Sequence, residues 1–498
     1  MRRSLSSYLM PSLVDIVFIS LLLALAYGTP SLRLLNDPGI GWHIRTGEWI
    51  LQNYSIPHTD LFSTLATRPW FAWEWLFDVG VAQVHSWWGL NGVLAGGALL
   101  VALTFALLFQ LTLRRGAPFL PTAGFVVLAL LASTIHCLAR PHLFTWLFTL
   151  LCWYLLEQKR DTPWLWAIPA IVLIWANVHG GFLIAFALGG LTLAGDLLTP
   201  SPPQDARRED ARRASIRLGR VLALSLAASL FNPYKASLYT HIYQYLTDTF
   251  LIHHIQEMQS PDFHSFAAKC FAALLFLTAC IAVSKRRQLR LGELFVLVFF
   301  AYAALFAVRN IPVACIVLTL TVAPLLTRDQ QAPVSFSQRM AAMESRSRGH
   351  AWAVLFILVT LATCANHGNF FGQPLIHASF NADRFPLRAV AYLNEHPSQG
   401  PLFTTDAWGG YVIYRLWPNQ RTVVDDRHDM YGSDYMKRYL KIIDGEPDWA
   451  AHLQATGAHS VLVSSTSALA SLLRLTPEWR LVYDDKQAVL FEHKPGAP

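Results

Sequence analysis

The sequence predicts a polytopic α-helical membrane protein with about eleven spans and a small α/β domain at its C-terminal end. Three observations support this fold class. The 498 residues are 54% hydrophobic and only 14% charged, and their mean hydropathy is +0.35. The hydrophobic residues form long runs, as they do in bilayer-spanning helices. From about Asn381 the composition changes to that of a soluble domain.

The hydrophobic runs define the predicted spans, and several are shorter than the roughly twenty residues that a bilayer requires. The spans are residues 12–33, 91–113, 119–138, 143–157, 164–179, 181–198, 219–232, 267–284, 292–308, 311–327 and 351–366. The first run continues past Ala26 without a clear cleavage site, which predicts a retained anchor. Residues 1–366 form the predicted transmembrane domain, and residues 367–498 form the predicted soluble domain.

Lysine and arginine are concentrated in alternate loops. One set of loops carries Arg2, Arg3, Arg114, Arg115, Lys159, Arg160, Arg207, Arg208, Arg212, Arg213, Arg217, Arg220, Lys285, Arg286, Arg287, Arg290, Arg328, Arg339, Arg346 and Arg348. The other set carries far fewer basic residues before the last span. The positive-inside rule therefore places the first set, with the N-terminus, in the cytoplasm. Residues 34–90, 233–266 and the C-terminal domain are then extracytoplasmic, and the predicted location is the inner (plasma) membrane of a bacterium.

Cysteine usage and net charge exclude several classes of function. The six cysteines lie in or beside apolar runs without a pairing pattern, so neither a disulfide framework nor a zinc site is expected. The net charge of +7 is divided among many loops, which argues against a nucleic-acid partner. Membrane lipids are the expected surroundings.

The predicted first outer loop, residues 34–90, is rich in polar and aromatic residues. Asp37 and Pro38 are typical of a helix start. Behind them, Trp42 and Ile44 alternate with polar residues, which favours an interfacial helix with aromatic rings at headgroup level. Asp37 is therefore either only a helix cap or a carboxylate held beside the membrane surface for chemistry.

Three further polar groups lie at the predicted outer ends of spans, where a charge is usually buried against a partner or a ligand. Arg140 and His142 lie between the third and fourth spans. Glu257 follows the seventh span and is either a solvated loop acid or a site residue. Arg309 interrupts an apolar run and suits either an ion pair with a carboxylate or a bidentate phosphate contact. Histidines such as His142 are more often structural than ligands.

In the predicted soluble domain, aromatic and acidic residues gather between residues 406 and 429. Gly409 and Gly410 permit close backbone approach. Trp408 and Tyr411 are three residues apart, so they suit the buried face of a helix as well as a binding site. The stretch therefore either shapes a site over the membrane or forms the core of the domain.

Together these features resemble the GT-C superfamily of polyprenyl-phosphate-dependent glycosyltransferases, and within it the catalytic subunit of oligosaccharyltransferase. Residues 257–261 are similar to the family's outer-loop Glu-x-Gln-Pro motif, and Arg309 resembles the arginine that meets the lipid-linked phosphates. Residues 406–411 and 419–425 resemble the start of the family's outer domain.

The resemblance implies an inverting glycosyltransferase that moves a sugar from a polyprenyl-phosphate or -diphosphate donor to an outer-face acceptor, which is a glycan, a lipid or a protein. Asp37 and Glu257 would be catalytic. The donor phosphate would be contacted by Arg309, Arg140 and His43. The acceptor or sugar would be contacted by Trp42, Trp408, Tyr411 and Asp425.

Two departures from the family pattern affect the expected chemistry. The family's second outer loop carries an acidic pair that helps bind a divalent metal, whereas residues 138–142 contain no acid. A magnesium or manganese ion would then be held by Asp37, Glu257 and His142, or no metal would be used. The family's Trp-Trp-Asp motif is also broken at Trp408, so recognition of an Asn-x-Ser/Thr peptide is not carried over.

A second class of function stays open: a non-catalytic lipid-binding or transport-associated membrane protein that keeps a GT-C-like scaffold. The missing acidic pair supports it. A transporter should show polar residues and broken helices at mid-membrane. The polar residues of this chain gather at one face instead, which favours the enzyme.

Overall fold

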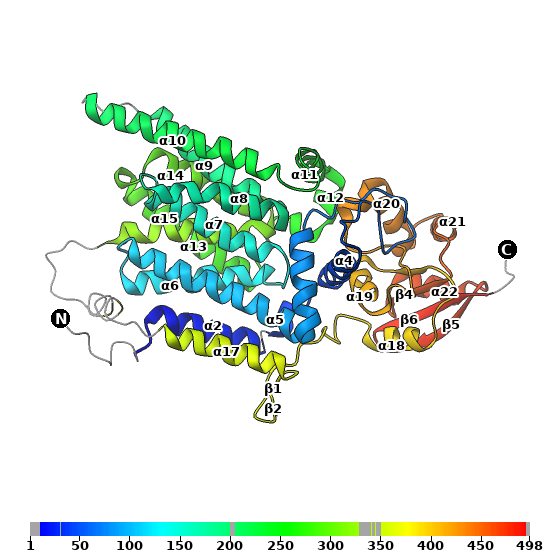
Figure 1. The fold of residues 1–498 in the computed structure, drawn as a ribbon. Coiled ribbons are helices and arrows are strands. Elements are labelled where there is room, and N and C mark those ends of the chain that lie inside the picture. The colour runs from blue at the N-terminus through cyan, green and yellow to red at the C-terminus, as the bar shows by residue number, and fades with distance from the viewer. Residues whose placement is uncertain are drawn as a thin grey trace.

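The computed structural model describes residues 10–29, 31–199, 205–327, 340, 344 and 350–494. A bundle of apolar helices forms one part of the molecule, and a mixed α/β unit with the C-terminus forms the other (Figure 1). The helix α4 (Gly39–Asn53) lies between the two parts.

Each predicted span coincides with a helix or with part of one. The bundle helices are α2 (Leu13–Tyr27), α5 (Trp75–Arg114), α6 (Phe119–Ser133), α7 (His142–Gln158), α8 (Ala167–Val178), α9 (Leu183–Leu198), α10 (Asp205–Ser229), α13 (Phe266–Ser284), α14 (Leu291–Phe306), α15 (Ile311–Val322) and α17 (Ala351–Ala365). Within the described residues, 5 helical stretches are long and apolar enough to cross a membrane, counting the short 3₁₀ turns that extend them. The number of spans therefore stays a prediction.

The bundle buries its centre and exposes apolar side chains at its periphery. Every residue of α15 is buried. By contrast, Phe276 and Val283 of α13 are 72% and 78% exposed, and Val298 of α14 is 62% exposed. Large apolar side chains on an outward face are stable in lipid rather than in water. The bundle is therefore embedded in a membrane.

The helix α5 belongs to both the bundle and the first predicted outer loop. Gly89 has a φ of +59° and divides the helix, a backbone conformation that glycine adopts without steric cost. The half before Gly89 packs against α4, where Gly47 lies directly against the backbone of Asp78. The half after Gly89 enters the bundle, as the predicted span 91–113 requires (Figure 1).

The C-terminal unit contains a four-stranded sheet in the order β3-β4-β6-β5. Its strands are β3 (Leu402–Thr404), β4 (Ser460–Ser464), β5 (Trp479–Asp484) and β6 (Ala488–His493). β3 is parallel to β4, and the other pairs are antiparallel. Its helices are α18 (Leu387–Glu395), α19 (Asp406–Leu416), α20 (His428–Ile443), α21 (Trp449–Ala455) and α22 (Ala468–Leu475). The remaining short elements include α3 (Ser31–Leu34), α11 (Ser237–Thr247), α12 (Thr249–His254), β1 (Asn369–Phe370) and β2 (Gln373–Pro374).

In the extended segment of residues 421–425, Thr422 forms isolated bridges rather than a regular strand. Thr422 pairs with Leu402 of β3 on one side and with Ser63 of the first predicted outer loop on the other. The backbone N–H of Thr64 donates to the carbonyl of Thr422 at 3.0 Å. The extended segment thus fastens the C-terminal unit to the predicted outer loop.

The exposure to lipid headgroups predicted for the aromatic side of α4 is not found, and the position of the helix at the membrane interface stays a prediction. Trp42 and Ile44 are 6% and 0% exposed, because α4 is covered by α5 on one side and by α19 on the other. Gly41 of α4 and Gly410 of α19 permit this close approach: a Cβ on Gly410 would overlap the carbonyl oxygen of Pro38.

A methyl group at Gly410 tests this contact. We expect Gly410→Ala to lower the free energy of unfolding by about 1–3 kcal/mol, because the backbones of α4 and α19 would have to separate. Gly80→Ala is the matched control, since no described atom lies within 4 Å of its added Cβ and alanine favours a helix. Thermal melting measures both variants. A melting temperature of Gly410→Ala equal to that of Gly80→Ala would contradict the contact.

Candidate active site

Asp37 and Arg140 form an ion pair at the end of the bundle that faces the C-terminal unit. Arg140 Nη1 lies 3.3 Å from Asp37 Oδ2, and the backbone N–H of Gly39 donates to Asp37 Oδ1 at 2.8 Å. The backbone N–H of Ala139 also donates to the carbonyl of Leu34 at 2.8 Å, which holds the two segments together. Asp37 therefore caps the first turn of α4 and also neutralises Arg140.

Asp426, in the segment before α20, approaches the same carboxylate. Trp42 Nε1 donates to Asp426 Oδ1 at 3.1 Å, whereas Asp426 Oδ2 is buried and has no hydrogen-bond partner among the described residues. A Cβ on Gly39 would lie 2.6 Å from Asp426 Oδ2 and 2.8 Å from Asp37 Oδ1. Burial, followed by the charge of Asp37, raises the pKa of Asp426 to about 7.

Glu257 and Arg309 form a second ion pair near the first. Arg309 Nη1 lies 3.6 Å from Glu257 Oε1, and the backbone N–H of Val308 donates to the carbonyl of Gln259 at 2.9 Å. Burial would raise the pKa of Glu257, but the charges of Arg309 and Arg140 outweigh it and lower the pKa. The side chains of Arg309 and Glu257 are 25% and 31% exposed, so a ligand can reach both.

Arg140 connects these groups electrostatically. Burial would lower its pKa, but the charges of Asp37, Glu257, Asp426 and Glu74 together raise it. Arg140 therefore stays charged, with four acidic side chains from distant segments around it.

A buried chain of histidines and acids lies behind the ion pairs. His43 has no exposed surface, and its Nδ1 lies 2.5 Å from Asp78 Oδ1. Glu74 lies 3.7 Å from Nε2 of His43 and 3.7 Å from Nε2 of His179. Burial raises the pKa of Glu74 to about 8 against the opposing charge of Arg140. His43 Nε2 is buried without a hydrogen-bond partner among the described residues, and the donor contact of His43 stays a prediction.

The tautomer of His179 follows from its neighbours. The backbone N–H of Gly181 donates to His179 Nδ1 at 3.0 Å, so this nitrogen is unprotonated. The ring proton is therefore on Nε2, directed at Glu74.

His142 is oriented by the backbone rather than by a carboxylate. Its Nε2 lies 2.8 Å from the carbonyl oxygen of His136, and the two imidazole rings stack at 4.0 Å. This arrangement is that of a structural histidine.

The predicted metal ligands do not form a ligand set. Within the described part of the chain, no three His, Cys, Asp or Glu side chains are grouped to hold an ion. Asp37 and Glu257 are each paired with an arginine, and His142 is bonded to the backbone. The positive charge beside Asp37 is supplied by Arg140.

The predicted acceptor residues of the C-terminal unit lie in its interior, as the core alternative proposed. Trp408 Nε1 donates to the carbonyl of Arg384 at 2.9 Å, and the ring of Tyr411 packs 4.8 Å from that of Phe380. Asp425 is fully buried, and its Oδ1 accepts from Arg427 Nε at 2.8 Å. Trp42 is likewise buried and holds Asp426.

Glu74 was not predicted as a site residue, and Asp426 and His428 were predicted only as members of the 406–429 stretch, without a place beside Asp37. His428 Nε2 lies 3.0 Å from Asp406 Oδ2. Burial would lower the pKa of His428, but its hydrogen bond to Asp406 raises it. Glu74 stands in an aromatic run, Trp73-Glu74-Trp75, where an acid between tryptophans was the available signal.

No family model and no curated protein matches this chain, but solved structures do. The archaeal oligosaccharyltransferase AglB from Archaeoglobus fulgidus, in complex with an inhibitory peptide and a dolichol-phosphate, has a TM-score of 0.56 at 10% identity, over 97% of this chain and 74% of that one. ArnT from Cupriavidus metallidurans, bound to undecaprenyl phosphate, has a TM-score of 0.50 at 12% identity, over 97% and 98%. Both are GT-C glycosyltransferases, so the predicted GT-C-like fold is confirmed.

The raised pKa of Asp426 predicts a pH dependence of stability. Because its pKa is about 7 in the folded protein, above the ordinary aspartate value of 3.8, the folded state binds the proton more tightly than the unfolded chain does. Stability therefore falls as pH rises through this window. The melting temperature of the wild type should decrease between pH 5 and pH 8, and Asp426→Asn should make this decrease smaller by about 2–5 °C. An amide oxygen still accepts from Trp42.

Melting curves at both pH values measure this difference. Asp383→Asn, which alters an exposed acid, is the control and should keep the wild-type pH dependence. Glu74 remains in every variant, so its own contribution cancels. Parallel pH profiles for Asp426→Asn and the wild type would contradict the assignment.

Proposed function

We propose that this protein is a glycosyltransferase that moves a sugar from a polyprenyl-phosphate or -diphosphate donor to an acceptor at the bundle end that carries Asp37. One observation carries the proposal. Two partly exposed guanidinium groups, Arg140 and Arg309, are each paired with a carboxylate, and the charges of both act on Glu257. This combination suits phosphate binding beside a base. The shared fold with AglB and ArnT supports it.

The proposed reaction is a single displacement with inversion. Asp37, paired with Arg140 at 3.3 Å, takes the proton from the acceptor hydroxyl as its oxygen attacks the anomeric carbon. The bond between that carbon and the phosphate oxygen breaks. Arg309 and Arg140 stabilise the negative charge on the departing phosphate. Glu257 positions Arg309 and the acceptor.

The ion pairs imply an exchange of partners when the donor binds. Arg309 Nη1 now lies 3.6 Å from Glu257 Oε1, and the oxygens of a phosphate can accept from the same guanidinium in place of this carboxylate. Glu257 would then be released toward the acceptor. Residues 138–142 contain no acid that could bind a metal. Arg140, in the same loop, would supply part of the positive charge that a metal would otherwise provide. Metal dependence is not part of the proposal.

The acceptor side is proposed to be formed by Asp426 and the Asp406–His428 pair, in place of the buried Trp408, Tyr411 and Asp425. Asp426 Oδ2 lies beside Asp37. This oxygen is buried and has no hydrogen-bond partner among the described residues. An acceptor hydroxyl between the two carboxylates would satisfy this oxygen.

A non-catalytic lipid-binding protein is the second candidate. The observation in its favour is that Asp37 is already paired with Arg140, and the second acidic pair of the family is absent. Such a protein would bind polyprenyl phosphate and release no sugar from it.

Substitution of Asp37 separates the two candidates. We expect Asp37→Asn to lower sugar transfer by on the order of 10²-fold or more. The variant also leaves Arg140 without its carboxylate partner, so its melting temperature should fall, and transfer is compared at a temperature at which both proteins are folded. The assay measures free polyprenyl phosphate, by mass spectrometry, after incubation with polyprenyl-phosphate sugars extracted from bacterial membranes. Asp434→Asn, at an acid that is 89% exposed, is the control. Full transfer by Asp37→Asn would overturn the catalytic role, and a wild type that binds donor but transfers none would favour the second candidate.

The proposed orientation is tested by cysteine labelling in spheroplasts. In a variant with the exposed Cys280 replaced by serine, Ser55→Cys and Thr466→Cys should react with an impermeant maleimide, since both positions are exposed at the proposed outer face. Ser284→Cys, which is exposed at the other end of the bundle, should react only after lysis. The reverse pattern would contradict the orientation and the access of the site to an outer acceptor.

A further inference from the structure

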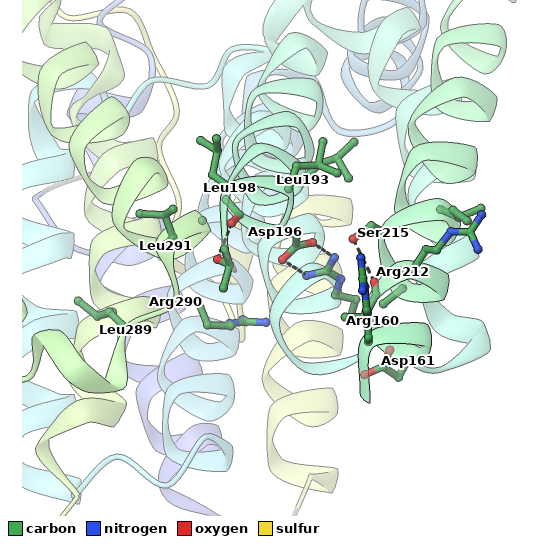
Figure 2. Close-up of a pocket in the computed structure, with 18 of the residues that line it drawn as sticks. Arg160, Asp161, Leu193, Asp196, Leu198, Arg212, Ser215, Leu289, Arg290 and Leu291 are labelled. Atoms are coloured by element: carbon green, nitrogen blue, oxygen red, sulfur yellow. Dashed lines mark hydrogen bonds and ion pairs between the residues drawn. The ribbon is translucent and has the colours of Figure 1, made fainter. Parts of the chain in front are cut away.

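A second charged cavity lies at the end of the bundle opposite Asp37. Its volume is about 1030 Å³. It is enclosed by the C-terminal end of α9, the first half of α10 and the start of α14 (Figure 2). α9 begins four residues after His179 of the candidate active site, behind the short 3₁₀ turn Gly180–Phe182, and runs 16 residues to Leu198, or roughly 24 Å. The cavity is therefore separate from the candidate active site.

Positive charge dominates the lining. Five arginines, Arg160, Arg208, Arg212, Arg286 and Arg290, face two acids, Asp161 and Asp196. Arg160 is bound by Asp196 through two hydrogen bonds (Figure 2). Arg290 pairs with Glu157 and Glu293, which lie deeper in the bundle. These two arginines are positioned by acids and are neutralised.

The remaining three arginines carry the available charge. Arg208 and Arg286 have no carboxylate within 4 Å in the part of the chain that the structure describes. Arg212 meets only Glu209 at 3.7 Å, and its side chain is 72% exposed, so water screens that pair strongly. Arg286 Nη1 donates to the carbonyl of Leu289 at 3.3 Å, which leaves its charge uncompensated. The cavity thus offers an anion two guanidinium groups without a carboxylate partner and one weakly paired group.

The floor of the cavity is rigid. A Cβ on Gly195 of α9 would overlap the backbone of Gly292 in α14, so the two helices are in direct backbone contact. The guanidinium of Arg115 lies beneath, 3.3 Å from Glu157 and 3.7 Å from Glu293. The cavity therefore rests on a packed junction of helices and charges.

The rim of the cavity is apolar and exposed. Leu197 and Leu198, in the last turn of α9, are 71% and 65% exposed, and Ile216 of α10 is 43% exposed. Leucines with this exposure beside arginines are typical of the boundary between acyl chains and headgroups. A soluble anion would leave them in water, whereas a lipid would cover them.

We propose that this cavity binds the phosphate headgroup of an anionic phospholipid of the surrounding membrane. Arg208, Arg212 and Arg286 contact the phosphate, and the acyl chains lie along Leu197, Leu198 and Ile216. Basic pockets between membrane helices are a recurring site for such headgroups. The positive-inside rule places the basic loops at this end of the bundle on the cytoplasmic side of the membrane. A bound lipid anchors α9, α10 and α14 at the end away from the candidate active site.

Native mass spectrometry of the full chain in detergent tests the proposal, with phosphatidylglycerol and phosphatidylcholine as probes. The wild type should retain phosphatidylglycerol in preference to phosphatidylcholine. The triple variant Arg208→Gln, Arg212→Gln, Arg286→Gln should bind phosphatidylglycerol at least tenfold more weakly, since each arginine contributes roughly a fivefold change in affinity.

The matched control removes the same charge outside the cavity: Arg114→Gln, Arg213→Gln, Arg287→Gln, three exposed arginines of the same end. It should bind phosphatidylglycerol as the wild type does, and both variants should melt near the wild-type temperature. Glycerol 3-phosphate provides the free-headgroup arm and should compete only at far higher concentration.

Three results would overturn the proposal. The first is equal phosphatidylglycerol binding by the cavity variant and the wild type. The second is an equal loss in the control variant, which would indicate general attraction to the basic face. The third is competition by glycerol 3-phosphate at the concentration of the lipid, which would identify a site for a soluble anion. None of these results bears on sugar transfer at Asp37.

Discussion

A charged arginine with only 21% of its side chain exposed, at one end of the bundle, is the constraint on which the rest of the candidate site depends. Most of Arg140 is removed from water, where an unpaired charge is costly. Asp37 neutralises it directly at 3.3 Å, and Glu257, Asp426 and Glu74 add to the same field. These acids come from four segments separated by up to hundreds of residues, so the fold has to bring those segments together around the guanidinium.

A second buried arginine fixes the C-terminal unit over this region. Arg427 lies 2.8 Å from Asp60 of the first predicted outer loop and 2.6 Å from Asp425, with its guanidinium 4.6 Å from the ring centre of Trp70. Breaking a buried network of this kind leaves an uncompensated charge, so its geometry is well defined. The neighbouring residue, Asp426, is thereby held against Asp37.

Much of this architecture could be predicted from the sequence, because hydrophobic runs and helix-start residues are local properties of the chain. The pairing of Arg309 with a carboxylate was one of its two predicted alternatives, and it is found with Glu257. Trp42 was wrongly predicted to be exposed to lipid headgroups. Periodicity shows which face of a helix is apolar, but it does not show whether lipid or protein covers that face. The sequence could place Asp426 in the 406–429 stretch but not beside Asp37, since it lies more than 380 residues away and the packing of Gly410 against Pro38 and the Arg427 network bring the two together.

The central claim is that Arg140 and Arg309 together bind a lipid-linked phosphate beside Asp37. The most direct measurement is an experimental structure of the protein with undecaprenyl phosphate. The account predicts phosphate oxygens within hydrogen-bonding distance of Arg309, with Arg140 close by and Glu257 released from its present partner. Phosphate density away from both arginines, with Asp37–Arg140 and Glu257–Arg309 paired as they are now, would contradict it.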